Sequence, residues 1–117
     1  RQGPIPIHVG GVTPPALRRA GTLGDGWIET GSKTFEELEA KLAVVAQHRR
    51  DAGRADLPFE VTLSSAFGKT ADAVKRCEDL GVSRVVVSAD PVDGRMTPEG
   101  TSDWVKRYAD TVIAKVR

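Results

Sequence analysis

Four short segments of the chain have the apolar and polar patterns of β-strands, and each segment leads into a stretch with helical spacing. In the first segment, Ile5, Ile7 and Val9 alternate with Pro6 and His8 at the two-residue period of a β-strand. Further strands are predicted over residues 26–30, 59–65 and 84–90. The last is an unbroken β-branched run, which is typical of a strand buried on both faces of a parallel sheet.

Four helices are predicted from their first residues. Thr13 is a good N-cap with Pro14 at the first helical position. Thr34 and Glu37 have the spacing of a capping box. The second helix should end near Gly53, and its apolar stripe is Phe35, Leu38, Leu42 and Val45.

The two later helices have similar patterns. Thr70 should cap a helix that ends at Gly81. Its apolar side carries Val74, Cys77 and Leu80. Residues 91–100 are predicted to be a loop, and Thr101 or Ser102 should begin the last helix. The buried face of that helix is predicted to be Val105, Tyr108, Val112 and Val116.

Four strand-helix units with short connections predict an α/β fold with a parallel sheet, right-handed crossovers and no antiparallel pairing. Periodicity alone does not separate a small open sheet from half of an eight-stranded barrel. The predicted inward set is more polar than the helix-facing set of Ile5, Ile7, Val61 and Leu63, which favours a barrel interior. That inward set is Pro6, His8, Glu60, Thr62 and Ser64. The polar strand ends expected at the carboxyl edge are Glu29, Thr30, Ser64, Ser65, Ser88 and Asp90.

Composition narrows the possible functions. The 117 residues fit one domain. Basic and acidic residues are interspersed and the net charge is +1, which argues against nucleic acid or membrane partners and favours a small-molecule substrate. The sequence has no membrane-length apolar run and no signal peptide, and Cys77 is its only cysteine, so a cytoplasmic location is expected. Because the chain begins at Arg1 and its only methionine is Met96, we expect a fragment of a longer protein.

The glycine pair Gly10-Gly11 is the main candidate for a binding site. It lies between the first strand and the helix capped by Thr13, where backbone N–H groups and the positive end of the helix dipole favour an anion. The alternative is a tight turn in which the glycines only satisfy backbone geometry. His8 precedes this turn on the predicted interior face, where it either hydrogen-bonds a ligand or is satisfied locally.

The residues around this turn resemble a known family. Gly10-Gly11, the following Ala-Leu-Arg-Arg-Ala of residues 16–20, the Gly-Asp-Gly-Trp of residues 24–27 and the Ala-Gly-Arg of residues 52–54 resemble the luciferase-like monooxygenase superfamily. The similarity is closest to its branch that uses the deazaflavin coenzyme F420. It implies that residues 1–117 are strands five to eight of a (β/α)8 TIM barrel.

The resemblance also implies a function. It assigns the backbone N–H groups of Gly10, Gly11, Val12 and Thr13 to the cofactor phosphate of an F420-dependent oxidoreductase. The catalytic residues stay unknown, because those of the family lie largely in the absent first half, and this chain alone should be inactive. The alternatives are an FMN-dependent monooxygenase of the same fold and a non-catalytic module for phosphate-ligand binding or assembly. The open half-barrel should form a homodimer through its sheet edges or associate with the missing half.

Other residues give weaker indications. Asp25 and Trp27 either line a pocket or serve the turn and the core. Glu29 and Glu60 lie on different strands, and no acid-base pair is predicted. We expect His48 to be solvated, and Trp104 and Tyr108 to form core or interface packing. The sequence predicts no metal site.

Overall fold

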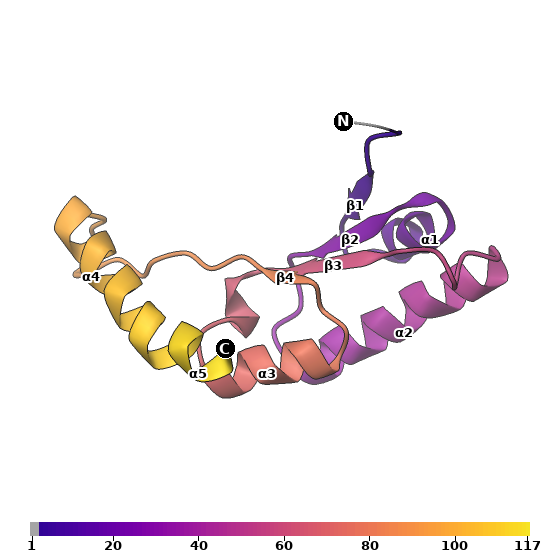
Figure 1. The fold of residues 1–117 in the computed structure, drawn as a ribbon. Coiled ribbons are helices and arrows are strands. Elements are labelled where there is room, and N and C mark those ends of the chain that lie inside the picture. The colour runs from indigo at the N-terminus through magenta and orange to yellow at the C-terminus, as the bar shows by residue number, and fades with distance from the viewer. Residues whose placement is uncertain (1–2) are drawn as a thin grey trace.

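The computed structural model describes residues 3–117, apart from the side chain of Ser65 (Figure 1). Its strands are β1 (His8–Gly10), β2 (Gly26–Glu29), β3 (Glu60–Leu63) and β4 (Arg84–Val85). They form a four-stranded sheet in the order β1-β2-β3-β4, and every neighbouring pair is parallel. The predicted α/β fold with a parallel sheet is therefore confirmed.

The helices are α1 (Pro14–Leu23), α2 (Phe35–Asp51), α3 (Ala71–Asp79), α4 (Pro98–Tyr108) and α5 (Ala114–Val116). Helix α1 follows β1, α2 follows β2, α3 follows β3, and α4 and α5 follow β4. A short 3-10 helix, η1 (Ser65–Phe67), follows β3, and a π-helical segment, η2 (Ala109–Ile113), joins α4 to α5.

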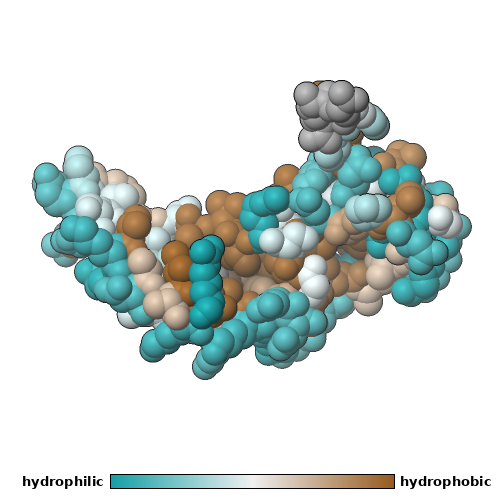
Figure 2. Space-filling model, viewed as in Figure 1, coloured by the Kyte–Doolittle hydropathy of each residue, from teal (hydrophilic) through white to brown (hydrophobic). Residues whose placement is uncertain are grey.

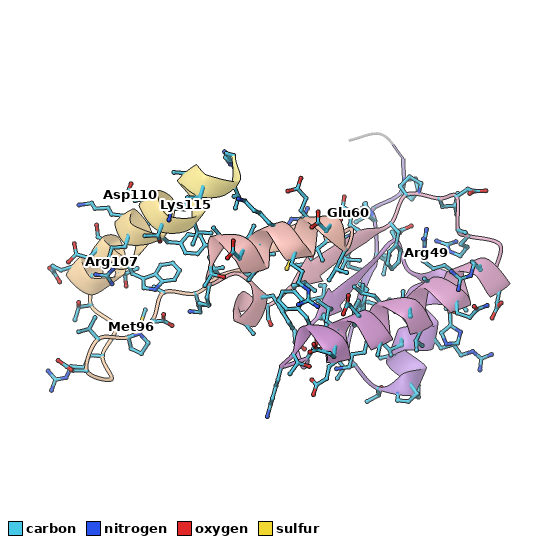
Figure 3. The ribbon with its side chains drawn as sticks, turned by 90° about the horizontal axis from the view of Figure 1, so that it is seen from below. Arg49, Glu60, Met96, Arg107, Asp110 and Lys115 are labelled. Atoms are coloured by element: carbon cyan, nitrogen blue, oxygen red, sulfur yellow. The ribbon has the colours of Figure 1, made fainter. Side chains whose placement is uncertain are left out.

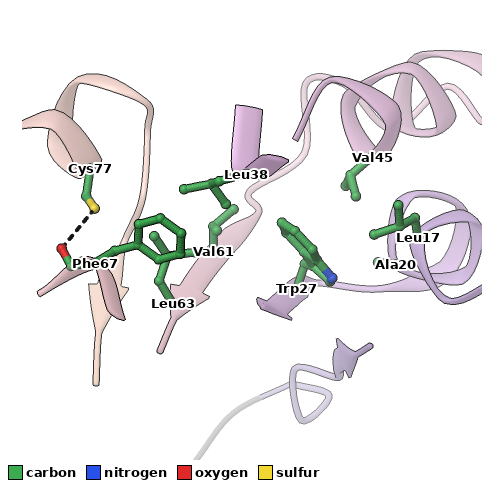
Figure 4. Close-up of a cluster of buried hydrophobic side chains, with 9 residues drawn as sticks. All are labelled: Leu17, Ala20, Trp27, Leu38, Val45, Val61, Leu63, Phe67 and Cys77. Atoms are coloured by element: carbon green, nitrogen blue, oxygen red, sulfur yellow. Dashed lines mark hydrogen bonds between the residues drawn. The ribbon is translucent and has the colours of Figure 1, made fainter. Parts of the chain in front are cut away.

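The sheet has one covered face and one open face. Trp27, Val61 and Leu63 point to the covered face, where they pack with Leu17 and Leu38 of the helices (Figure 4). The register places His8, Gly26 and Glu60 side by side on the other face, where Ile28 is 36% exposed. Consecutive strand order with right-handed crossovers puts the crossover helices on one side, as in a barrel, whereas a doubly wound sheet has helices on both. The structure therefore agrees with half of a (β/α)8 barrel.

The predicted helix starts and ends are set by local contacts. The hydroxyl groups of Thr13, Thr34 and Thr70 each accept a hydrogen bond from a backbone N–H in the first turn of α1, α2 and α3. Gly53 and Gly81 have φ values of +70° and +83° just beyond the ends of α2 and α3, where glycine is favoured. The caps predicted for these helices are confirmed.

The first strand is shorter than predicted. It begins at His8, so the prediction that Ile5 and Ile7 belong to the strand was wrong, and both side chains are largely exposed, at 74% and 60%. Pro6 has no N–H to donate to a neighbouring strand, which disfavours an earlier start. The N–H of Ile7 instead donates to the carboxylate of Asp25.

The fourth strand is also shorter than predicted. Only Arg84–Val85 belongs to β4, and the prediction that residues 84–90 are buried on both faces was wrong because Val86 is 53% exposed. The reason lies in β3, which ends at Leu63 and turns into η1. After the N–H of Val86 donates to the carbonyl of Leu63, β3 offers no further extended backbone to pair with.

The last helix begins earlier than predicted. Thr97 caps α4 by accepting from the N–H of Gly100. An isolated antiparallel bridge between Val92 and Arg95 precedes it, so the prediction of no antiparallel pairing was wrong for this loop. Val105 is 54% exposed, so its assignment to a buried face was wrong, whereas Val112 is buried. Figure 3 shows the cause, since α4 reaches beyond α3 and the sheet, with Met96 near its far end.

His48 also differs from its prediction. It is half-buried, not solvated, because it lies against α1 at Gly21. A Cβ added at Gly21 would come within 2.5 Å of the Cβ of His48. This glycine allows α1 and α2 to approach each other closely.

Candidate functional site

The turn between β1 and α1 depends on its two glycines in different ways. Gly11 has a φ of +116°, and a Cβ added there would lie 2.9 Å from the Cβ of Ala16. Both facts favour glycine at this position. Gly10 has no positive φ, and a Cβ added there would meet nothing within 4 Å. The space next to Gly10 is therefore open to a ligand.

Free N–H groups gather in this turn. Within residues 3–117, the backbone N–H groups of Val12 and Thr13 donate to no acceptor, whereas the N–H of Gly11 continues the β1–β2 ladder, in which Gly10 is paired with Ile28. The first turn of α1 offers less, because Pro14 and Pro15 have no N–H. The next N–H groups, of Ala16 and Leu17, already donate to the side chain and carbonyl of Thr13. The donors available to an anion thus come from the turn itself.

Trp27 holds the turn from the core side. Its indole Nε1 donates to the carbonyl oxygen of Gly11 at 2.8 Å, and its side chain is fully buried. In a trans peptide the C=O and the following N–H point in opposite directions. The bond from Trp27 therefore directs the N–H of Val12 away from the core. From the sequence, Trp27 either lines a pocket or packs in the core. In the structure it is buried in the core and also positions the turn.

Glu29 fixes the neighbouring loop. It is fully buried on the helix-covered face, and its Oε1 accepts from the N–H groups of Gly31 and Ser32 at 2.5 Å. Its Oε2 has no partner among the described residues. A Cβ added at Gly31 would lie 3.0 Å from a methyl group of Val12, so this loop packs beside the glycine turn. The role of Glu29 was missed from sequence, because its partners are backbone groups.

A polar cluster lies on the open face of the sheet. His8 Nε2 is 4.0 Å from a carboxylate oxygen of Glu60, which also pairs with Arg84 at 3.1 Å. Arg84 in addition donates to the hydroxyl of Thr62 at 3.2 Å. His8 thus lies on the same face of the sheet as Gly10, two residues earlier in β1 and beside Glu60. Glu29 and Glu60 lie on opposite faces of the sheet.

Asp25 lies at the opposite end of the strands from the glycine turn. It accepts from the N–H of Ile7 at 2.8 Å and lies 3.7 Å from the guanidinium of Arg54. Arg54 also donates to the carbonyl of Gly24 at 3.2 Å. These contacts join the end of α2 to the start of β2, so Asp25 braces the amino edge of the sheet.

A hollow of about 420 Å³ lies between α4 and the segments that follow η1 and β4. Asp90 lies in it and accepts from Lys69 Nζ at 2.7 Å and from Trp104 Nε1 at 3.2 Å. These hydrogen bonds, that of Lys69 first, hold the pKa of Asp90 below its usual value. Trp104 stacks on Tyr108 with ring centroids 5.0 Å apart. Tyr108 donates to the carbonyl of Gly68 at 2.6 Å, and Lys69 Nζ lies 5.4 Å from the centre of the Trp104 ring, so the aromatic pair joins α4 to the loop after η1.

Among residues 3–117, no three His, Cys, Asp or Glu side chains are grouped so that they could hold a metal ion. In the same part of the chain, no helix combines the length and the apolar character needed to cross a bilayer.

Comparison with known proteins identifies the family. The profile of the luciferase-like monooxygenases matches residues 1–95. The chain belongs to this family. It is also 42% identical to an uncharacterized protein of Mycobacterium tuberculosis (strain H37Rv) and to one of Mycobacterium bovis, over 97% of this chain. It spans about two fifths of the length of these relatives, since the match covers 40% of each. No solved structure matches the chain.

The predicted superfamily is thus confirmed, and its F420-dependent branch stays a prediction. Luciferase-like monooxygenases are oxidoreductases that use flavin or F420. The glycine turn, with its free N–H groups, lies within the matched residues.

Proposed function

We propose that this chain supplies the cofactor phosphate site of an F420-dependent oxidoreductase. The observation that carries the proposal is the pair of free N–H groups at Val12 and Thr13, next to the open space at Gly10. A phosphate group is strongly favoured by several convergent N–H donors at the start of a helix. The residues present therefore fit the phosphate end of such a cofactor.

Each part of the turn has a distinct task in this proposal. Gly10 leaves room for the phosphate, and Gly11 takes the backbone conformation that aligns the donors. Trp27 fixes the peptide of Gly11 and Val12 so that little reorganisation is needed when the anion binds. F420, when bound, supplies hydride transfer through its deazaflavin ring. The chain's own contribution is to bind and orient the cofactor. His8, on the same sheet face as Gly10, is the proposed side-chain contact to the cofactor.

FMN is the second candidate ligand. It too ends in a phosphate, and the donors of the turn would bind either group. The resemblance of the glycine turn and of residues 24–27 to the F420 branch ranks F420 first. The activity of the whole protein, with the further length that its relatives have, is part of the proposal.

The test uses the amide resonances of the turn. Inorganic phosphate, F420 and FMN are titrated into the 15N-labelled chain, and we expect the amides of Gly11, Val12 and Thr13 to shift together. Gly10→Val places a bulky side chain in the open space without a positive φ and should weaken binding by about tenfold, equal to about 1.4 kcal/mol. Gly10→Ala is the matched control and should have a smaller effect.

The outcomes separate the candidates. Tighter binding of F420 than of FMN supports the proposal, and the reverse order favours an FMN-dependent monooxygenase. Binding of inorganic phosphate alone would favour the non-catalytic phosphate-binding or assembly module. Affinity that is unchanged in a folded Gly10→Val variant would show that the turn is not the phosphate site.

A further inference from the structure

Two neighbouring turns from strand to helix differ in what their backbone N–H groups bind. In the turn between β1 and α1, the N–H groups of Val12 and Thr13 donate to no acceptor among the described residues. In the turn between β2 and α2, three N–H groups donate to side-chain carboxylates of this chain, and they belong to Gly31, Ser32 and Lys33. The donors of the second turn are therefore already filled by internal negative charge.

Glu29 holds this second turn. Its Oε1 accepts from the N–H groups of Gly31 and Ser32, each at 2.5 Å. Hydrogen bonds from backbone N–H groups to a carboxylate are stronger than those between neutral groups. Lys41 Nζ in addition donates to the hydroxyl of Ser32 at 2.8 Å and brings a positive charge to the same loop. The conformation of residues 31 and 32 is therefore set by the Glu29 carboxylate.

Glu29 is buried by elements of this chain. Its side chain is 0% exposed on the helix-covered face of the sheet, and its Oε2 has no partner among the described residues. Figure 2 shows hydrophilic surface along the lower side of the molecule, where α3 and the start of α2 form the outer layer. The carboxylate thus lies inside this layer, away from water. Because a buried charge is costly without hydrogen bonds, its two bonds to the loop are hard to break.

The loop that Glu29 holds lies against the glycine turn. A Cβ added at Gly31 would lie 3.0 Å and 3.3 Å from the two methyl groups of Val12. Gly31 has no positive φ, so the close approach to Val12, and not the backbone conformation, favours glycine there. A shift of the Gly31 backbone therefore changes the space available to Val12, whose N–H is one of the two free donors.

We propose that Glu29 is a positioning residue of the phosphate site, an inference that rests on the proposed function. By binding the second turn, Glu29 keeps the backbone of Gly31 against Val12. This contact keeps the N–H groups of Val12 and Thr13 in place before the anion arrives, so binding needs little reorganisation. Trp27 holds the same turn through its indole N–H. Two buried side chains of β2 thus support the phosphate site.

The test compares two substitutions at Glu29. Glu29→Gln keeps an oxygen that can accept from Gly31 and Ser32, whereas Glu29→Leu is of similar size and has no acceptor. Inorganic phosphate is titrated into the 15N-labelled chain and followed by the amides of Val12 and Thr13. Glu29→Leu should raise the dissociation constant by about tenfold, because two N–H groups lose their acceptor and the loop moves. Glu29→Gln should retain most of the affinity.

Gly31→Ala tests the contact with Val12 directly. It leaves the acceptor of Glu29 in place but puts a methyl group 3.0 Å from a methyl group of Val12, so it should also weaken phosphate binding. Leu63→Val is the control for destabilisation alone, because it changes a buried position on β3, away from both turns. It should leave phosphate affinity unchanged.

Amide hydrogen exchange without phosphate gives a second readout. The amides of Gly31 and Ser32 should exchange slowly in the wild-type chain and in Glu29→Gln, and fast in Glu29→Leu. No phosphate-induced shift of Val12 and Thr13 in the wild-type chain would overturn the proposed phosphate site, and the role of Glu29 with it.

Other outcomes concern Glu29 alone. Equal phosphate affinity of the wild-type chain and a folded Glu29→Leu variant would overturn its positioning role and leave the phosphate site standing. So would equal affinity losses in Glu29→Leu and Leu63→Val, since general destabilisation would then explain both. If Glu29→Leu does not fold, Gly31→Ala decides, and unchanged affinity in that variant would overturn the positioning role.

Discussion

The indole N–H of Trp27 donates to the carbonyl oxygen of Gly11 at 2.8 Å and joins the second strand to the turn that follows the first. The bond crosses the layer between β2 and α1, because Trp27 points to the covered face and Gly11 precedes the helix. It fixes one peptide plane of the turn and thereby the direction in which the N–H of Val12 points. The core and the candidate phosphate site are thus physically connected.

Trp27→Phe should therefore weaken phosphate binding. Phenylalanine retains much of the buried apolar volume but cannot donate to Gly11, so the turn is no longer held in the binding conformation. We expect a several-fold loss of affinity for inorganic phosphate, measured from the amide shifts of Gly11, Val12 and Thr13.

The control for this prediction is Leu63→Val, which also removes volume from a buried position but lies on β3, away from the turn. It should reduce stability with little effect on phosphate affinity. Equal affinity losses in the two variants would mean that general destabilisation, and not the hydrogen bond, explains the effect of Trp27→Phe.

The two glycines of the turn should respond differently to alanine. Gly11→Ala should cost about 1–3 kcal/mol of stability, because a φ of +116° is strained for alanine and its Cβ would crowd Ala16. Gly10→Ala, whose Cβ meets nothing within 4 Å, should be close to neutral. Urea unfolding of both variants provides the measurement. A neutral Gly11→Ala would show that the turn has another conformation in solution.

The features predicted correctly from sequence depend on residues close together in the chain. The caps of Thr13, Thr34 and Thr70 need only the next few residues, so the starts of α1, α2 and α3 followed from local patterns. Gly53 and Gly81 ended their helices for the same reason. The parallel order followed from repeated strand-helix units.

The features that sequence did not predict depend on distant contacts. The length of β4 is set by the end of β3 at Leu63, which the β-branched run of residues 84–90 does not reveal. The exposure of Val105 follows from the reach of α4 beyond α3, although its spacing is that of a buried residue. At the site, the glycine pair was evident in the sequence, but its hydrogen bond with Trp27 and the loop contacts of Glu29 were not.

The covered face of the sheet predicts which positions of α2 matter for stability. Leu38 is fully buried in the core cluster, whereas Val44 is 41% exposed on the same helix. Leu38→Ala should reduce the free energy of unfolding by about 2–5 kcal/mol. Val44→Ala should stay within about 0.5 kcal/mol of wild type. Comparable losses in chemical denaturation would contradict the assignment of the buried stripe.

The remaining prediction concerns stability at alkaline pH. Burial raises the pKa of the Cys77 thiol above its usual value of 9.0, and the nearby Arg76 opposes the shift only in part. The folded chain therefore holds this proton more tightly than the unfolded chain. The resulting stability is complete below pH 9.0 and is lost as the pH rises through the folded-state pKa.

Cys77→Ala should flatten this dependence, because alanine has no proton to release. Burial also raises the pKa of Tyr108, and its contribution remains in both proteins, so the difference between the two pH profiles isolates Cys77. Urea unfolding from neutral pH to above the usual thiol pKa provides both profiles. Parallel profiles would mean that Cys77 is accessible to water in the folded chain, against its burial beside the carbonyl of Phe67.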